Sequence, residues 1–197
     1  MNIQPIVEGH GEADAVPVLL RRLACEAGAR DSALLSEHGL QTSVELALMY
    51  ENCGGILVLF EDEDGCPAEL GPLLGRWAAV RAGGVPFAIA LAHREYEAWF
   101  LAALDSLRGR RGIAREAKWD TDPERPRGAK EALEKLMERP YRETQDQAAL
   151  SAVFDMAQAY HRSRSFRHLV KAVGDLLRQM GQPPAAWPPA SWTTAGR

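Results

Sequence analysis

The stretch ILVLFEDEDG, residues 56–65, decides the fold that this sequence predicts. Its first five residues are apolar without alternation, which is typical of a strand in a parallel sheet that helices cover on both faces. Four consecutive acidic residues and a glycine follow at once, so this strand ends in a charged turn. A helix is expected next, over residues 67–82, with proline in its first turn, where proline is well tolerated. The stretch thus predicts a strand–turn–helix unit with a row of carboxylates at the carboxyl end of the strand.

The same order of elements flanks this unit on both sides. Apolar residues repeat at helical spacing in the expected helices and form short continuous runs in the expected strands. In chain order we expect strand 3–7, helix 13–29, helix 42–50, strand 56–60, helix 67–82, strand 85–91 and helix 95–107. Residues 30–40 fit either a short strand or a turn. Strands that alternate with helices predict an α/β fold, with a mostly parallel sheet flanked by helices.

The character of the sequence changes after residue 107, where a basic connection with glycine and proline begins. Three further helices are expected, over residues 128–138, 145–160 and 163–180. We therefore divide the chain into an α/β core (1–107), a basic helical extension packed on that core (108–180) and a proline-rich tail (181–197). The tail is expected to be extended, with Trp187 or Trp192 packed on the body of the protein.

Charge is distributed unevenly between these parts. The net charge is −4, but residues 1–107 hold 16 acidic and 6 basic side chains, whereas residues 108–197 hold 11 acidic and 17 basic ones. One interpretation is ordinary solvated surface in both halves. The other is an acidic, metal-binding half beside a basic half that holds phosphates. Composition alone leaves both interpretations open.

Composition also disfavours several classes of protein. A chain of 197 residues suits one hydrophobic core rather than two. No apolar run approaches the roughly 20 residues that span a bilayer, and the first residues show neither the basic segment nor the cleavage pattern of a signal peptide. Three cysteines without a CxxC pair argue against a disulfide framework and against a thiolate zinc site. We expect a cytoplasmic protein that has no membrane partner.

Acidic residues follow every expected strand. Glu8 and Glu12 follow the first strand, residues 61–64 follow the second, and Glu95 and Glu97 follow the third. In a parallel sheet these strand ends meet at one edge, where ligand sites form. Carboxylates a few Å apart repel one another unless a cation balances their charge. Oxygen ligands without a His or Cys cluster favour Mg²⁺, Mn²⁺ or Ca²⁺ over Zn²⁺.

Three segments together resemble a known family: IVEGHGEADAVPVLLRRL (6–23), ILVLFEDEDGCPAELGPLL (56–74) and REYEAWFLA (94–102). They are similar to the Toprim-like proteins of unknown function that are related to OLD-family nucleases. The resemblance covers residues 3–107 and continues weakly through RGAK (127–130) and SRSF (163–166). It implies a Toprim-like fold, in which a glutamate after one strand and an Asp-x-Asp pair after another bind divalent metal for phosphodiester chemistry.

The resemblance also implies which residues act. Glu8 matches the glutamate after the first strand, which serves as metal ligand or general base, and Glu97 matches the acidic residue of the EAWF motif. The implied metal ligands are Glu8, Glu12, Glu61, Glu63, Asp64 and Glu97, with Glu95 assisting, and the implied ion is Mg²⁺ or Mn²⁺. The expected catalytic residues are Glu8, Glu12, Glu61, Glu63 and Lys130, the lysine because it could neutralise a transition-state phosphate.

The acidic pair after the central strand allows two alignments with the Asp-x-Asp pattern. Counted from the strand end, Glu61 and Glu63 take the two positions; counted by residue type, Asp62 and Asp64 take them. Side chains alternate along a strand, so only one pair can face the crevice that Glu8 enters. We favour Glu61 and Glu63, because Glu61 stands at the exit of the strand. Asp62 is then expected to point outward.

Several of these residues also have a purely structural interpretation. Glu12 suits the positive end of a helix dipole, His10 suits a hydrogen bond within the glycine-rich turn, and Lys130 suits an ordinary Lys/Glu helix face. A group of basic residues either binds phosphate or pairs with the acids of the first half: Arg162, Arg164, Arg167, His168 and Lys171. The sequence does not separate these interpretations.

The sequence therefore predicts a divalent-metal-dependent nuclease that hydrolyses or nicks DNA or RNA, whose backbone the basic half holds without reading sequence. The resemblance implies an ATPase of SMC/ABC type as partner in phage defence, and a chain without GxxxxGK[ST] does not supply that ATPase itself. One alternative is a non-catalytic metal- or nucleic-acid-binding regulatory module with a degenerate site, which glutamate in place of aspartate favours. The other is a small-molecule phosphatase, against which the missing DxDx[TV] signature argues.

Overall fold

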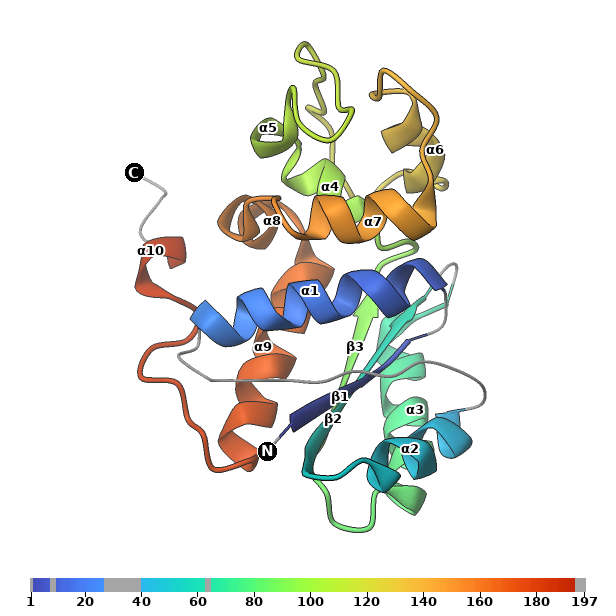
Figure 1. The fold of residues 1–197 in the computed structure, drawn as a ribbon, viewed down its shortest axis with the longest axis vertical. Helices are drawn as coiled ribbons and strands as arrows, with labels where there is room; N and C mark the ends of the chain where they lie inside the picture. The colour runs from blue at the N-terminus through green and yellow to red at the C-terminus, as the bar shows by residue number, and fades with distance from the viewer. Residues whose placement is uncertain (1, 8–9, 27–39, 63–64, 194–197) are drawn as a thin grey trace.

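Apolar runs in the first half of the chain form the sheet. In a computed structural model, which describes residues 2–7, 10–26, 40–62 and 65–193, three strands lie parallel in the order β1 (Asn2–Ile6), β2 (Cys53–Glu61) and β3 (Phe87–Ala92) (Figure 1). All strands in the described part of the chain therefore end at the same edge of the sheet. The predicted α/β fold, with a mostly parallel sheet flanked by helices and a helical extension after it, is confirmed.

The helices of the described residues are α1 (His10–Glu26), α2 (Leu40–Met49), α3 (Pro67–Arg81), α4 (Ala98–Ala102), α5 (Leu104–Leu107), α6 (Ala129–Glu134), α7 (Glu143–Ser151), α8 (Met156–Arg162), α9 (Arg164–Gln179) and α10 (Ala190–Thr193). Figure 1 shows that α4 to α8 gather beyond the carboxyl ends of the strands. None of the helices within the described ranges is long and apolar enough to cross a membrane.

The two faces of the sheet carry separate apolar clusters, which explains the unbroken apolar run in β2. Ile56 and Val58 pack on one face with buried residues of α2 and α3. Leu57 and Leu59 alternate with them and pack on the other face, in the cluster that contains α1 and α9. Because both faces of β2 are covered, Ile56 to Leu59 are buried and Phe60 is partly buried, and the alternation of apolar with polar residues seen in half-exposed strands is absent.

Helix α9 joins the second half of the chain to the core by packing on the sheet. Ser163 begins the helix by accepting a hydrogen bond from the backbone N–H of Phe166. One stripe of the helix is buried against β3 and β2: Phe166, Leu169, Val170, Val173, Leu176 and Leu177. Each such buried side chain contributes about 1.5–3 kcal/mol. The helices after residue 107 and the strands before it thus share one apolar cluster.

The structure differs from the sequence predictions mainly at helix ends. The helix expected over 145–160 is two helices, since Asp155 accepts hydrogen bonds from the backbone N–H groups of Ala157 and Gln158 and so begins α8. The tail is held in place, because the Trp187 indole donates to the Val170 carbonyl at 2.6 Å and Trp192 is buried within α10. Most of the ambiguous segment 30–40 lies outside the described residues.

The aromatic contacts of Phe166 lead to a stability prediction. Its ring lies edge-on to Trp99 at 5.4 Å and to Phe154 at 5.7 Å, and it is fully buried. Phe166→Ala should lower the free energy of unfolding by about 3–5 kcal/mol, measured by urea denaturation. Trp77→Ala is the control, because Trp77 is 46% exposed on α3 and should lose less than about 1 kcal/mol. Equal losses in the two variants would contradict the assignment of Phe166 to the core.

Candidate functional site

Acidic side chains from three segments meet at the carboxyl edge of the sheet. Glu61 is the last residue of β2, Glu97 follows β3, and Glu12 lies in the first turn of α1. The backbone N–H of Tyr96 donates to Glu61 Oε1 at 2.7 Å, which fixes this carboxylate against the turn after β3. Glu12 and Glu97 are 7% and 1% exposed. Parallel strands thus bring together residues that are far apart in the sequence.

Helix α7 supplies the groups that hold two of these carboxylates. Gln147 Nε2 donates to Glu12 Oε1 at 3.0 Å and to Glu97 Oε1 at 3.2 Å. The Tyr141 hydroxyl, just before α7, donates to the same Glu97 oxygen at 2.7 Å. Gln147 is fully buried, and its Oε1 has no hydrogen-bond partner among the described residues. We call Glu12, Glu61, Glu97 and Gln147 the acid cluster.

Burial and mutual repulsion disfavour negative charge in the acid cluster. Burial raises the pKa of Glu61 to about 8; the hydrogen bond from Tyr96 works against this rise, and the charges of Glu12, Glu97 and Glu95 add to it. Burial likewise raises the pKa of Glu97 to about 7, against the hydrogen bond from Tyr141 and the charge of Lys130. Ionisation of all these acids would therefore place more negative charge in the site than its own groups stabilise, and a bound cation would relieve the repulsion.

Lys130 lies close enough to Glu97 for its positive charge to lower the pKa of that carboxyl. Its ammonium group pairs with the Glu143 carboxylate. Partial burial disfavours its charge, but the Glu143 hydrogen bond and the charges of Glu97, Glu143 and Glu61 outweigh that effect, so the pKa of Lys130 is raised. Glu95 accepts from the backbone N–H groups of Gly128 at 3.1 Å and Lys130 at 2.8 Å, which ties the start of α6 to the turn after β3.

Asp62 diverges from Glu61, as alternation along a strand requires. It is buried, although the sequence predicted that it points outward. Its carboxylate lies 2.9 Å from His93 Nδ1 and accepts from the backbone N–H of Arg94 at 2.6 Å. Arg94 has φ 63°, in the left-handed region. Asp62 therefore holds the turn after β3 from one side, while Glu61 holds it from the other.

The other sequence-predicted site residues are placed as follows. The structure brings Glu12, Glu61 and Glu97 together, with Lys130 beside them. Glu8, Glu63 and Asp64 lie outside the described residues, as does the side chain of His10. Three members of the basic group have partners other than those acids: Arg162 and Arg167 donate to backbone carbonyls, and Lys171 pairs with Asp175.

Sequence reasoning missed Gln147, Tyr141 and Glu143. Nothing local distinguishes Gln147, which lies in an alanine-containing helix far along the chain from the acids that it binds. Gly11 is a sequence feature related to this contact, but its role is clear only once the structure is known. An added Cβ there would lie 2.5 Å from Gln147 Oε1 and 2.6 Å from Glu143 Cγ, so α1 and α7 approach closely because residue 11 has no side chain.

The residues that could hold a metal are the three glutamates, whose ligands are all oxygen. This donor set fits a hard cation such as Mg²⁺ or Mn²⁺, as does the Gln147 oxygen, which has no hydrogen-bond partner among the described residues. Within the ranges that the structure describes, no three Asp, Glu, His or Cys side chains are set around one point as metal ligands. Three of the six ligands expected from the sequence fall in the gaps between those ranges.

Comparison with known proteins identifies the family. Residues 7–174 match the family described as a domain of unknown function, DUF4276. The chain belongs to the DUF4276 family. This DUF4276 domain spans both the segments that carry the acids and those that supply Lys130, Tyr141 and Gln147. No curated protein and no solved structure matches the chain.

The close approach at Gly11 can be tested by Gly11→Ala. Alanine favours a helix by up to about 1 kcal/mol over glycine, but overpacking against the buried Gln147 and the half-buried Glu143 costs about 1–3 kcal/mol. We expect a net loss of about 1–2 kcal/mol in the free energy of unfolding. Gly71→Ala in α3 is the matched control, because nothing lies within 4 Å of its added Cβ and it should be stabilising. Stabilisation by both substitutions would show that α7 does not press on Gly11.

The raised pKa values predict how stability depends on pH. Between the ordinary value of 4.5 and the folded values of about 8 for Glu61 and about 7 for Glu97, the folded protein binds more protons than the unfolded chain. Stability should therefore fall as pH rises from about 4.5 to about 8. Melting temperatures measured across this range in EDTA should decrease more steeply for the wild type than for Glu61→Gln. A wild-type curve that rises or matches the variant would contradict the repulsion.

Proposed function

We propose that this DUF4276 protein is a divalent-metal-dependent nuclease that hydrolyses phosphodiester bonds. One observation carries the proposal: the buried Glu12 and Glu97 and the half-buried Glu61 come from three segments and share one edge of a parallel sheet, with pKa values raised to about 8 in Glu61 and about 7 in Glu97. Repulsion among the ionised acids destabilises the fold, a divalent cation bound between them would offset it, and perturbed carboxylates of this kind gather at functional sites. The resemblance to Toprim-like proteins points the same way.

Glu12, Glu61 and Glu97 would hold Mg²⁺ or Mn²⁺, together with Glu8, Glu63 and Asp64 by resemblance. When bound, the metal supplies activation of water and stabilisation of charge on the phosphate and the leaving oxygen. The chain's own groups orient the carboxylates. Tyr141 and Gln147 fix one oxygen of Glu97, and the Tyr96 backbone fixes one oxygen of Glu61. The orientation of each carboxylate is therefore set, and its other oxygen is available to bind metal.

Lys130 would contribute positive charge where the phosphate binds. Glu143 holds its ammonium group in position, and the raised pKa keeps that group charged at neutral pH. A fixed cation stabilises charge that develops in the transition state without having to reorganise. The excess of basic residues after residue 107 supports a polyanionic substrate, DNA or RNA. An ATPase of SMC/ABC type in phage defence, and a cytoplasmic location, belong to the same proposal by resemblance.

A non-catalytic regulatory module is the second candidate, and one set of contacts favours it. Glu61, Asp62 and Glu95 each accept hydrogen bonds from backbone N–H groups, so these acids also stabilise the turn after β3 and the start of α6. Acids with such a structural role can persist in a site that no longer cleaves. In this case the protein binds metal or nucleic acid without turnover.

A cleavage assay separates the two candidates. Purified protein is incubated with plasmid, single-stranded DNA and RNA, each with Mg²⁺, Mn²⁺ or EDTA. We expect metal-dependent cleavage that Glu97→Gln abolishes, because the amide removes the charge that binds metal. Gln147→Ala should lower the rate by about 10–100-fold, the usual effect of losing a group that orients a ligand. Glu116→Gln is the matched control on an exposed glutamate and should cleave normally.

The contrary results are distinct from one another. Full activity in a folded Glu97→Gln protein would remove this residue from the site. Absence of cleavage under every condition, combined with a Mn²⁺-induced rise in melting temperature that Glu97→Gln loses, would select the regulatory module. A bound metal at a hundredfold excess over its Kd raises stability by about 2.7 kcal/mol, which such a measurement detects easily.

A further inference from the structure

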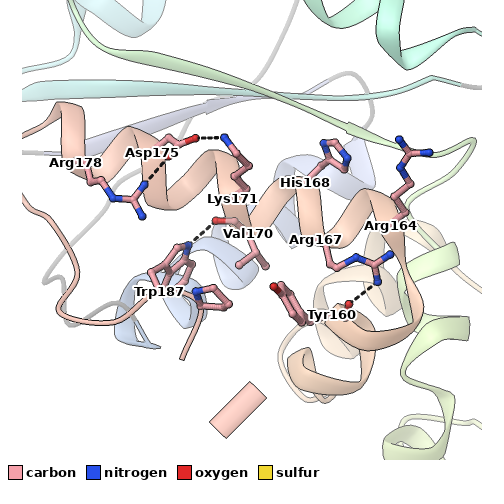
Figure 2. A pocket seen from close by; sticks show the side chains of 10 residues that line it. Tyr160, Arg164, Arg167, His168, Val170, Lys171, Asp175, Arg178 and Trp187 are labelled. Carbon is pink, nitrogen blue, oxygen red and sulfur yellow. Dashed lines mark hydrogen bonds and ion pairs between the residues drawn. The ribbon is translucent and has the colours of Figure 1, made fainter. Parts of the chain in front are cut away.

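A hollow in the surface lies on the outer face of α9, away from the sheet. Its volume is about 510 Å³, and it lies between α9, the ring of Tyr160 in α8, and the Trp187–Pro188 segment of the tail (Figure 2). We call it the α9 groove. Its lining residues are Tyr160, Arg164, Arg167, His168, Val170, Lys171, Asp175, Arg178, Trp187 and Pro188. None of them belongs to the acid cluster.

The α9 groove carries a stripe of positive charge. Arg164, His168, Lys171, Asp175 and Arg178 follow one another at steps of three or four residues, so they lie on one side of the helix. At 1.5 Å per residue, the stripe is about 21 Å long. This length exceeds what a single phosphate group or mononucleotide can contact. The stripe therefore suits an extended polyanion.

The positive charge of the groove is only partly balanced. Asp175 is shared between Lys171, at 2.6 Å, and Arg178, at 2.5 Å (Figure 2). Arg167 donates to the carbonyls of Tyr160 and His161, which hold its guanidinium group in place without neutralising it. The Arg164 side chain has no partner among the residues that the structure describes. One carboxylate thus faces four permanent cations in this groove.

Fixed aromatic rings stand beside these cations. The Trp187 indole donates to the Val170 carbonyl at 2.6 Å, and it lies so close to α9 that an added Cβ at Gly174 would meet its Cδ1 at 2.1 Å. The centre of the Trp192 ring lies 6.3 Å from the centre of the Trp187 ring and 5.9 Å from that of the Tyr160 ring. The rings of Trp187 and Tyr160 therefore form firm walls of the groove rather than loose surface side chains.

We propose that the α9 groove binds single-stranded nucleic acid. Cations along a backbone track, with aromatic rings on which bases stack, are the combination that binds single strands without sequence preference. Phosphates lie along Arg164, Lys171 and Arg178, and bases lie against Trp187 and Tyr160. A duplex cannot use these rings, because its bases are already stacked within the helix. This inference rests on the proposed nuclease function, for which it names a single-stranded substrate, but binding in the groove requires neither metal nor cleavage.

The test is the binding of a fluorescently labelled single-stranded oligonucleotide, followed by anisotropy in EDTA at several salt concentrations. The wild type should bind it more tightly than the duplex of the same sequence. Arg164→Gln combined with Lys171→Gln should weaken binding at least tenfold and reduce the slope of log affinity against log salt by about 1.4, for two lost phosphate contacts. The matched control is Arg76→Gln combined with Arg110→Gln, an equal change of charge on exposed residues outside the groove.

Other outcomes overturn the inference. Equal weakening in the two double variants would mean attraction by net charge alone, and tighter binding of the duplex would mean that the rings take no part. Equal binding to vesicles rich in anionic lipid, competing with the oligonucleotide, would assign the groove to a membrane surface. Cleavage is a separate readout: Glu97→Gln should bind the oligonucleotide like the wild type. A protein that binds through the groove but never cleaves would leave this inference standing and remove the proposed nuclease.

Discussion

Two buried carboxylates held by one amide are the constraint on which the rest of the site depends. Gln147 donates to both Glu12 and Glu97, which come from opposite ends of the amino-terminal half. Burying either carboxylate without a donor would cost several kcal/mol. The amide reaches both because α7 lies directly on α1, and glycine at residue 11 lets α7 lie that close without overpacking. The arrangement of the acids at the strand edge therefore depends on how the second half of the chain packs against the first.

Much of the fold could be predicted from the sequence because its signals are local. The apolar run before Glu61 specifies a buried strand, and parallel strands share an edge, so the meeting of Glu12, Glu61 and Glu97 follows from the strand ends alone. The partners of these acids could not be predicted, because Gln147 and Tyr141 are selected by tertiary packing. Asp62 shows the same limit: alternation predicted its divergence from Glu61, but not the buried contact with His93 that it makes instead.

Helix α9 divides its two faces between stability and recognition. Its apolar stripe closes the core over β2 and β3, while the opposite stripe carries the cations of the α9 groove. The sequence could not assign the basic residues either to phosphate binding or to acid partners. The structure divides them into residues that bind backbone carbonyls and residues that face solvent in the groove. Arg162 satisfies carbonyls of Ala102, Trp119 and Thr121, whereas Arg164 faces solvent in the groove. The net charge of residues 108–197 does not reveal this division.

The bond between Gln147 and Glu12 spans 135 residues of chain, which has a consequence for biosynthesis. The ribosome releases the strands and their acids first, and the donor that organises them emerges much later. Until residue 147 leaves the exit tunnel, the nascent protein carries its carboxylates without the amide that aligns them. Assembly of the acid cluster is therefore a late event of synthesis, and a chain cut short in translation keeps the acids but lacks their arrangement.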